Sequence, residues 1–166
     1  MSERENLFNV IRDFKVIRDF KTAMMVSLKT SNAMHVRPMA VAEIDSNGGL
    51  YFATRLKSPK VSEIEQHPSV LVTFQDGQKF AALEGRATIS QDKALIDRLW
   101  SETWLTWFPD GKNDPSLCLI KVDPVSGEYW DNAGLRGLKY VFESVKAIST
   151  GTTPSSTSDQ HGNVSL

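Results

Sequence analysis

The chain has 166 residues and a mass of 18.5 kDa, which is the size of one ordinary domain. Hydrophobic residues make up 40% and charged residues 23% of it, a balance that excludes wholesale disorder. The net charge of −1 argues against a general nucleic-acid binder, and no apolar run reaches the length of a membrane span. A single cysteine, Cys118, excludes an internal disulfide and a multi-cysteine metal site. Because the charged N-terminus is unlike a signal peptide, we expect a cytoplasmic protein with no nucleic-acid or membrane partner.

Apolar residues spaced three and four apart predict a helix over the first twenty residues. This segment contains a tandem hexapeptide, VIRDFK, at residues 10–15 and 16–21. A repeat this short adds at most about two helical turns, so we interpret it as a local duplication within a surface helix.

From residue 24 onward the apolar residues recur with a period of two, which is typical of strands. The strongest hairpin signal is the sequence Asp-Ser-Asn-Gly-Gly at residues 45–49. A second break, at residues 123–127, contains Pro124 and Gly127 and predicts a connection between the last two strands. Strands are therefore expected at residues 24–28, 34–44, 50–54, 70–74, 79–90, 117–122 and 128–130.

Two helices are predicted within this series, one over residues 59–66 and one from about residue 92 to beyond residue 100. Hairpin-linked strands with few helices favour a mainly β fold, an antiparallel barrel with flanking helices. A last helix is expected over residues 137–148. Residues 149–166 are rich in Ser, Thr and Gly and poor in apolar residues, so we expect a disordered tail after a single domain over residues 1–148.

The loop that enters the first of these helices has the composition of an anion site. Ser58 is a good N-cap, and the proline after it suits the first helical position, where exposed amide groups attract anions. Two hydroxyls and three cations lie close together there, on Thr54, Ser58, Arg55, Lys57 and Lys60. The loop would hold a phosphate monoester, but an ordinary capped helix with solvated lysines has the same pattern.

Arg37 is a second candidate for anion binding, because it lies between apolar residues in the middle of a predicted strand. A buried arginine needs a partner, and a phosphate matches its planar donors. A carboxylate such as that of Glu43 or Glu84 would also serve. Pro38 cannot donate a ladder hydrogen bond, so this strand is expected to be bulged or at an edge there.

Trp100, Trp104 and Trp107 would share one face if the second helix continued that far. They fit core packing or, with Trp130, an aromatic wall for a planar ligand or a subunit interface. The histidines are scattered, no metal-binding or catalytic motif is present, and Cys118 is expected to be inert packing. Any chemistry would therefore have to come from a bound cofactor.

These segments together resemble the pyridoxamine 5′-phosphate oxidase-like split barrels that bind flavin. The flavin-binding motif is matched by Phe52-Ala53-Thr54, by Ser58 and Lys60, and by His67-Pro68-Ser69-Val70. The general stress protein branch is matched by Arg37-Pro38-Met39, Glu84-Gly85-Arg86-Ala87, Trp107-Phe108-Pro109, Asp114-Pro115 and Glu128-Tyr129-Trp130-Asp131. The resemblance covers about residues 10–133. It implies a split β-barrel that forms a homodimer with FMN at the subunit interface.

The resemblance also implies roles for individual residues. Arg37 and Lys60 would hold the phosphate with help from Thr54 and Ser58, and Ala53 belongs to the same motif. The isoalloxazine ring would lie along the main chain of Pro38, Met39 and Ala40. Trp107 and Trp130 would flank the flavin from the partner subunit.

The chain departs from the oxidase itself at three places. Pro59 stands where the oxidase has a second basic residue, residues 136–138 read Arg-Gly-Leu without the substrate-binding histidine, and Phe80 replaces a glutamine that meets the flavin. We therefore expect an FMN-dependent oxidoreductase of the general stress protein type, with a small-molecule electron donor or acceptor, and not a pyridoxamine 5′-phosphate oxidase. The alternatives are a non-catalytic flavin-binding or stress-response dimer, or a split barrel that uses deazaflavin, FAD or haem.

Overall fold

The computed structural model describes residues 22–45, 47–131 and 161–165. Its strands are β1 (Thr22–Leu28), β2 (Met34–Ile44), β3 (Leu50–Arg55), β4 (Ser69–Asp76), β5 (Lys79–Ser90), β6 (Leu117–Asp131) and β7 (His161–Ser165). Its helices are α2 (Pro59–Gln66), α3 (Lys93–Leu99) and the 3₁₀ helices η2 (Glu102–Thr106) and η3 (Gly111–Asn113). The predicted N-terminal helix, its VIRDFK repeat and the helix expected over residues 137–148 lie outside the described residues.

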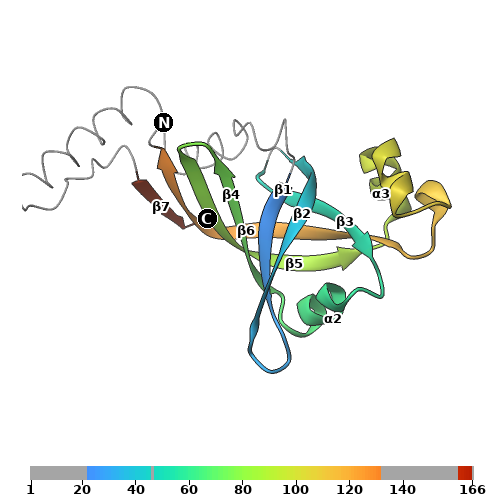
Figure 1. Ribbon diagram of the computed structural model, residues 1–166, viewed down its shortest axis with the longest axis horizontal. Coiled ribbons are helices and arrows are strands. Elements are labelled where there is room, and N and C mark those ends of the chain that lie inside the picture. The colour runs from blue at the N-terminus through green and yellow to red at the C-terminus, as the bar shows by residue number, and fades with distance from the viewer. Residues whose placement is uncertain (1–21, 46, 132–160, 166) are drawn as a thin grey trace, which may run out of the picture.

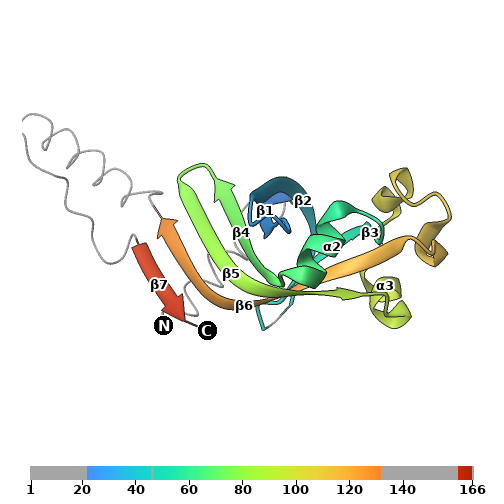
Figure 2. The ribbon, with the colours of Figure 1, turned by 90° about the horizontal axis from the view of Figure 1, so that it is seen from below.

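Strands β1 to β6 form a closed antiparallel barrel (Figures 1 and 2). The strand order is β3-β2-β1-β4-β5-β6, and β3 pairs with β6 from Leu50–Val122 to Arg55–Leu117, which closes the circle. Closure gives every strand of the wall a partner on both sides over at least part of its length, which limits the unpaired edges. The predicted mainly β fold, a split barrel with flanking helices, is confirmed.

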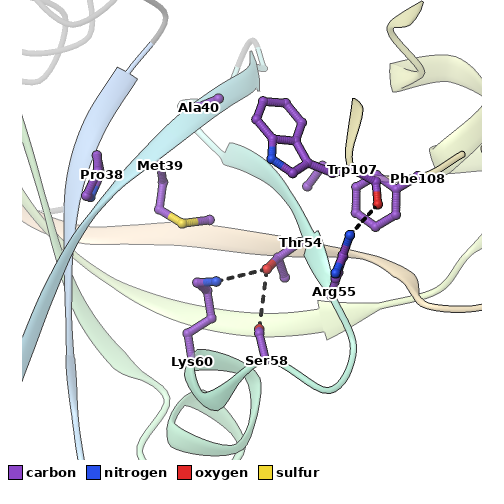
Figure 3. Close-up of a pocket in the computed structure, with 10 residues that line it drawn as sticks. Pro38, Met39, Ala40, Thr54, Arg55, Ser58, Lys60, Trp107 and Phe108 are labelled. Atoms are coloured by element: carbon purple, nitrogen blue, oxygen red, sulfur yellow. Dashed lines mark hydrogen bonds between the residues drawn. The ribbon is translucent and has the colours of Figure 1, made fainter. Parts of the chain in front are cut away.

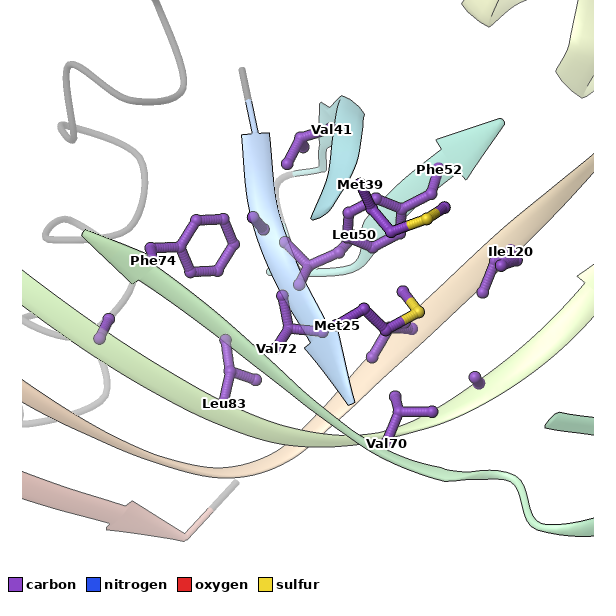
Figure 4. Packing of buried hydrophobic residues seen from close by; sticks show 14 of the residues in the cluster. Met25, Met39, Val41, Leu50, Phe52, Val70, Val72, Phe74, Leu83 and Ile120 are labelled. Carbon is purple, nitrogen blue, oxygen red and sulfur yellow. The ribbon is translucent and has the colours of Figure 1, made fainter. Parts of the chain in front are cut away.

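The core follows from the alternation of apolar residues along the strands. In β1, for example, Ala23, Met25 and Ser27 are buried while Met24 is exposed, as the period of two requires. The buried residues meet inside the barrel (Figure 4), and among them are Met25, Met39, Val41, Leu50, Phe52, Val70, Val72, Phe74, Leu83 and Ile120. A second cluster lies between α3, η2 and the start of β6 and contains Ile96, Trp104, Phe108, Leu117 and Leu119.

Strands β2 and β3 separate partway along their length, and this separation positions the site. They pair only between Val41–Phe52 and Ile44–Leu50, with a bulge in that register. Residues 38–40 precede the paired part of β2, and residues 53–55 follow the paired part of β3. Within the described part of the chain, β2 has a strand partner on only one side at Pro38, which fits the prediction of an edge or bulge there.

Two predicted elements near the C-terminus differ from the structure. The break expected at residues 123–127 is absent, because β6 runs through Pro124 and pairs with β5 between Leu119 and Asp131, on both sides of the proline. A register shift between Glu84 and Gly85 absorbs the proline instead. Within the predicted tail, residues 149–166, His161–Ser165 form β7 and pair with β6, and its other residues lie outside the described ranges.

The second helix is shorter than predicted. It ends at Leu99, because Trp100 has an extended backbone (φ −53°, ψ 133°), and the chain continues as η2. Trp100 and Trp104 make an edge-to-face pair with ring centroids 5.6 Å apart, and Trp104 is buried. Trp107 is instead 56% exposed, so the three tryptophans do not share one helical face.

Candidate functional site

A cavity of about 450 Å³ opens where β2 and β3 separate (Figure 3). It is lined by Pro38, Met39, Ala40, Ala53, Thr54, Arg55, Ser58, Lys60, Trp107 and Phe108. These residues come from β2, β3, the start of α2 and the segment after η2. Every residue predicted for the site lines this cavity except Arg37 and Trp130.

One end of the cavity, the polar end, is formed by Thr54, Ser58 and Lys60. Nζ of Lys60 donates to Oγ1 of Thr54 at 3.1 Å, and the Thr54 and Ser58 hydroxyl oxygens lie 3.4 Å apart (Figure 3). Ser58 occupies the N-cap position of α2, but its hydroxyl makes no capping hydrogen bond among the described residues. The Ser58 hydroxyl is therefore directed to the cavity and not used in an ordinary cap.

The surroundings of Lys60 disfavour the charged form of its side chain. Burial lowers the pKa of its ammonium group, and the positive charge of Arg37 lowers it further. An anion beside Lys60 would offset both effects, because it would pair with the charged form of the lysine. The polar end thus has the charge and the hydroxyl donors of an anion-binding site.

Arg37 has a different partner from those considered in the sequence. Its Nη2 donates to Oε2 of Glu63 at 2.7 Å and to Oγ of Ser27 at 2.8 Å, whereas Glu43 pairs with Arg98 and Glu84 accepts from Ser126. The Nε and Nη1 atoms of Arg37 are buried and have no hydrogen-bond partner within the described residues. Such unpaired donors are costly and are typical of a site that a ligand completes.

Glu63 is the functional candidate that sequence reasoning missed. It lies in α2, is 8% exposed, and accepts hydrogen bonds from Oγ of Ser27 (2.5 Å) and from Arg37. Its Oε1 lies 2.9 Å from Nδ1 of His35. Burial alone would raise the pKa of Glu63, but the Ser27 and His35 hydrogen bonds and the Arg37 charge hold it below its ordinary value.

The other end of the cavity, the aromatic end, is formed by Arg55, Trp107 and Phe108. The Trp107 ring projects between β2 and β3 (Figure 3), and Phe108 anchors the segment by packing into the second core cluster. Nη2 of Arg55 donates to the main-chain oxygen of Trp107 at 2.8 Å. Trp107 therefore lines the cavity of its own chain, and its expected action from a partner subunit stays a prediction.

The remaining predicted residues lie elsewhere. Trp130 is near the far end of β6, where it pairs with Phe80 of β5 and with His161 of β7. The cavity lies at the other end of β6, where Thr54 pairs with Cys118. Cys118 is fully buried, and burial raises the pKa of its thiol to about 11, which agrees with inert packing.

Among the described residues, no group of three or more metal-ligating side chains is found, and no helix there is long and apolar enough to cross a membrane.

The comparison with known proteins decides the family. The model of the family described as pyridoxamine 5′-phosphate oxidase like matches residues 10–155, which is most of the chain. The chain belongs to the pyridoxamine 5′-phosphate oxidase-like family. The family assignment agrees with the split-barrel fold.

Named relatives place the chain beside general stress proteins of this family. General stress protein 26 of Bacillus subtilis (strain 168) is 31% identical over 80 residues, which are 45% of this chain and 56% of that protein. The chain thus matches little more than half the length of this curated relative. A crystal structure from Jannaschia sp. CCS1, named for general stress protein 26, covers 98% of both chains with a TM-score of 0.70 and 24% identity. The general stress FMN/FAD binding protein of Xanthomonas citri is 27% identical, with a TM-score of 0.66 over 78% of this chain and 92% of that one.

Proposed function

We propose that the chain binds FMN in the cavity between β2 and β3, with its phosphate at the polar end. The observation that carries this proposal is the pair of buried nitrogens on Arg37 that have no hydrogen-bond partner among the described residues, together with Lys60, whose pKa is lowered by burial and by the Arg37 charge. A phosphate dianion offers the acceptors and the charge that both side chains need, and the Thr54 and Ser58 hydroxyls supply further donors. The Xanthomonas citri relative, named for FMN/FAD binding, supports the same class of ligand.

The rest of the cavity suits a planar ring. Its volume of about 450 Å³ is within the range of small-molecule sites. Residues 38–40 offer main-chain groups that β3 does not pair, and Ala40 and Ala53 leave space for a ring beside them. The Trp107 indole at the aromatic end would cover the open side of the flavin by stacking.

The proposal includes a homodimer. The outer face of β1, β2 and β4 carries exposed apolar side chains, and cross-strand pairs join Val26 to both Val36 and Leu71. Met24 (39% exposed) pairs with Pro38, so this face continues into the cavity lining. A second copy would cover an apolar face of this kind and close the cavity. Trp130, which is remote from the cavity of its own chain, would then approach the flavin from the partner.

The bound flavin would supply hydride or electron transfer with a small-molecule donor or acceptor. The described lining contains no carboxylate, imidazole or thiol, so the chain would contribute orientation and exclusion of water rather than proton transfer. The same lining favours a second candidate, a dimer that binds flavin without turnover. Anaerobic reduction of the bound flavin by NADH or NADPH supports the oxidoreductase, and failure of both donors supports the binding protein.

The binding proposal is tested first by the visible spectrum of the purified protein and by the mass of whatever heat releases. FMN supports it, whereas release of FAD, a deazaflavin or haem alone would contradict the cofactor assignment. Fluorescence titration then compares FMN with riboflavin, which has the same ring and no phosphate. We expect the wild-type protein to prefer FMN, because only FMN occupies the polar end.

Lys60→Ala sharpens this test. Losing one charge-assisted contact of about 1.5–3 kcal/mol should weaken FMN binding by about tenfold or more and leave riboflavin binding nearly unchanged. Lys57→Ala is the matched control, because Lys57 is an exposed lysine of the same loop that does not line the cavity. Equal FMN affinities for Lys60→Ala and Lys57→Ala would contradict the assignment of the polar end.

A further inference from the structure

Glu63 joins α2, which carries Lys60 of the polar end, to the strands β1 and β2, which carry Ser27 and Arg37. Its carboxylate belongs to α2, the helix whose first turn carries Lys60, and it receives donors from two strands of the barrel wall. Ser27 of β1 and Arg37 of β2 both bind Oε2, at 2.5 and 2.7 Å, and His35 of β2 contacts Oε1 at 2.9 Å. These contacts fix α2 against the β1–β2 hairpin through one buried side chain.

The contacts of Glu63 also determine how Arg37 is presented. Glu63 and Ser27 together occupy Nη2 of Arg37, so that nitrogen is held on the protein side. The remaining nitrogens, Nε and Nη1, stay without a partner among the residues that the structure describes. A guanidinium that is held at one corner keeps its other donors in a fixed orientation, which reduces the entropy lost when a ligand binds.

We propose that Glu63 is a positioning residue for the ligand phosphate, which acts by holding Arg37 of β2 at a fixed place relative to Ser58 and Lys60 of α2. This inference rests on the proposed function, because it assumes that a phosphate occupies the polar end. Glu63 is not among the residues that line the cavity, so its effect would pass through Arg37 and through the placement of α2. The lowered pKa of the Glu63 carboxyl agrees with this role, since the group is ionised and bonded at neutral pH.

Charge alone predicts the opposite effect, which makes the proposal testable. Arg37 and Lys60 carry two positive charges, and Glu63 offsets one of them. If Glu63 only reduced the local charge, Glu63→Gln would leave more positive charge for the phosphate and would tighten FMN binding. If Glu63 positions Arg37, the same change should weaken FMN binding, because the amide presents its own N–H₂ group to donors that need an acceptor.

The measurement is the ratio of riboflavin to FMN dissociation constants in the full chain, by fluorescence titration. We expect Glu63→Gln to lower the preference for FMN by about tenfold, with riboflavin affinity changed by less than about twofold. Glu65→Gln is the matched control, because Glu65 is an exposed carboxylate of the same helix. An unchanged or increased FMN preference would overturn the proposal, and so would an equal loss for both flavins, which indicates general destabilisation.

A double-mutant cycle checks that Glu63 acts through Arg37. In an Arg37→Met background, Glu63→Gln should have almost no further effect on the FMN preference, whereas independent roles would make the two losses add. Ser27→Ala provides a second route if Glu63→Gln fails to fold: it removes one contact from both Glu63 and Arg37, and we expect a smaller loss in the same direction. No change in the preference for Ser27→Ala would count against the proposal. A wild-type protein that does not prefer FMN over riboflavin would instead refute the proposed function itself.

Discussion

The two ends of the cavity are held in different ways. At the polar end, Thr54 of β3 is joined by hydrogen bonds to Ser58 and Lys60 at the start of α2, and the buried Glu63 of the same helix holds Arg37 of β2 nearby. At the aromatic end, Trp107 lies on the segment between η2 and η3, is 56% exposed, and is fixed by the Arg55 contact to its main-chain oxygen. If the cavity binds FMN as proposed, its phosphate would meet a site preorganised by the barrel, whereas the residue covering the ring would be held by fewer contacts.

The largest effect is expected from damage to the barrel that supports the polar end. A Cβ at Gly85 would lie 2.6 Å from Cγ1 of Val122 and 2.8 Å from the main-chain oxygen of Asp123, at the register shift between β5 and β6. Gly85→Ala should therefore lower the free energy of unfolding by about 3 kcal/mol, because the backbone cannot move away cheaply.

Gly111, in η3, provides the contrast near the aromatic end. It has φ +70° with nothing within 4 Å of an added Cβ, so Gly111→Ala should cost about 1 kcal/mol through backbone strain alone. Urea denaturation measures the free energy of unfolding of both variants, and we expect the m-value to stay unchanged. Equal losses for the two glycines would contradict the view that the barrel wall is the less tolerant region.

The second prediction concerns the cover over the ring. Trp107→Ala should weaken FMN and riboflavin equally, by about tenfold, because stacking involves the ring that both ligands share. The free energy of unfolding should change by less than about 0.5 kcal/mol, since the side chain is largely exposed. Leu105→Ala is the control, because Leu105 is an exposed residue of η2 that does not line the cavity. A loss confined to FMN would show that Trp107 serves the phosphate and not the ring.

The polar end could be predicted from sequence because its signals are local. Ser58, the proline after it and Lys60 lie within three residues, and local chemistry fixes the strand end and the helix start around them. Pro38 likewise indicated the unpaired stretch of β2, because a proline cannot donate to a ladder. The strands of the barrel wall were predicted for the same reason, because apolar residues at every second position can be recognised within a single strand.

The features that sequence reasoning missed depend on contacts between distant residues. Glu63 meets Ser27 across 36 positions, and nothing near it in sequence distinguishes it from an exposed helical glutamate. Pro124 was read as a break, but pairing along the whole of β5 holds β6 together across it. The family resemblance implied the place of Trp107 at the cavity, but the expected helical face shared with Trp100 and Trp104 was wrong, because α3 ends at Leu99.

The third prediction tests how the cover is held. Arg55→Met removes the hydrogen bond from Arg55 to the Trp107 main-chain oxygen and keeps most of the apolar stem. We expect both flavins to bind about threefold more weakly, because an exposed hydrogen bond contributes modestly. Arg55→Met combined with Trp107→Ala should be no weaker than Trp107→Ala alone. A loss for FMN that riboflavin does not share would mean that Arg55 contacts the phosphate directly.

The smallest effect near neutral pH is the proton linkage at Lys60. Burial and the Arg37 charge lower the pKa of Lys60 in the empty cavity, and a bound phosphate dianion would raise it again. The bound state therefore favours the protonated lysine, so FMN affinity is full below the pKa of the empty form. The affinity falls as the pH rises through that pKa and levels off above the pKa of the bound form.

Two comparisons isolate this linkage in titrations between neutral and alkaline pH. Lys60→Arg should remove the decline, because a guanidinium stays charged throughout the range, while FMN affinity at neutral pH stays within about threefold of the wild type. Riboflavin should show no such decline in either protein, since it carries no phosphate to pair with Lys60. If FMN affinity still falls with rising pH in Lys60→Arg, the group that loses its proton is not Lys60. That result would contradict a proton linkage at the polar end.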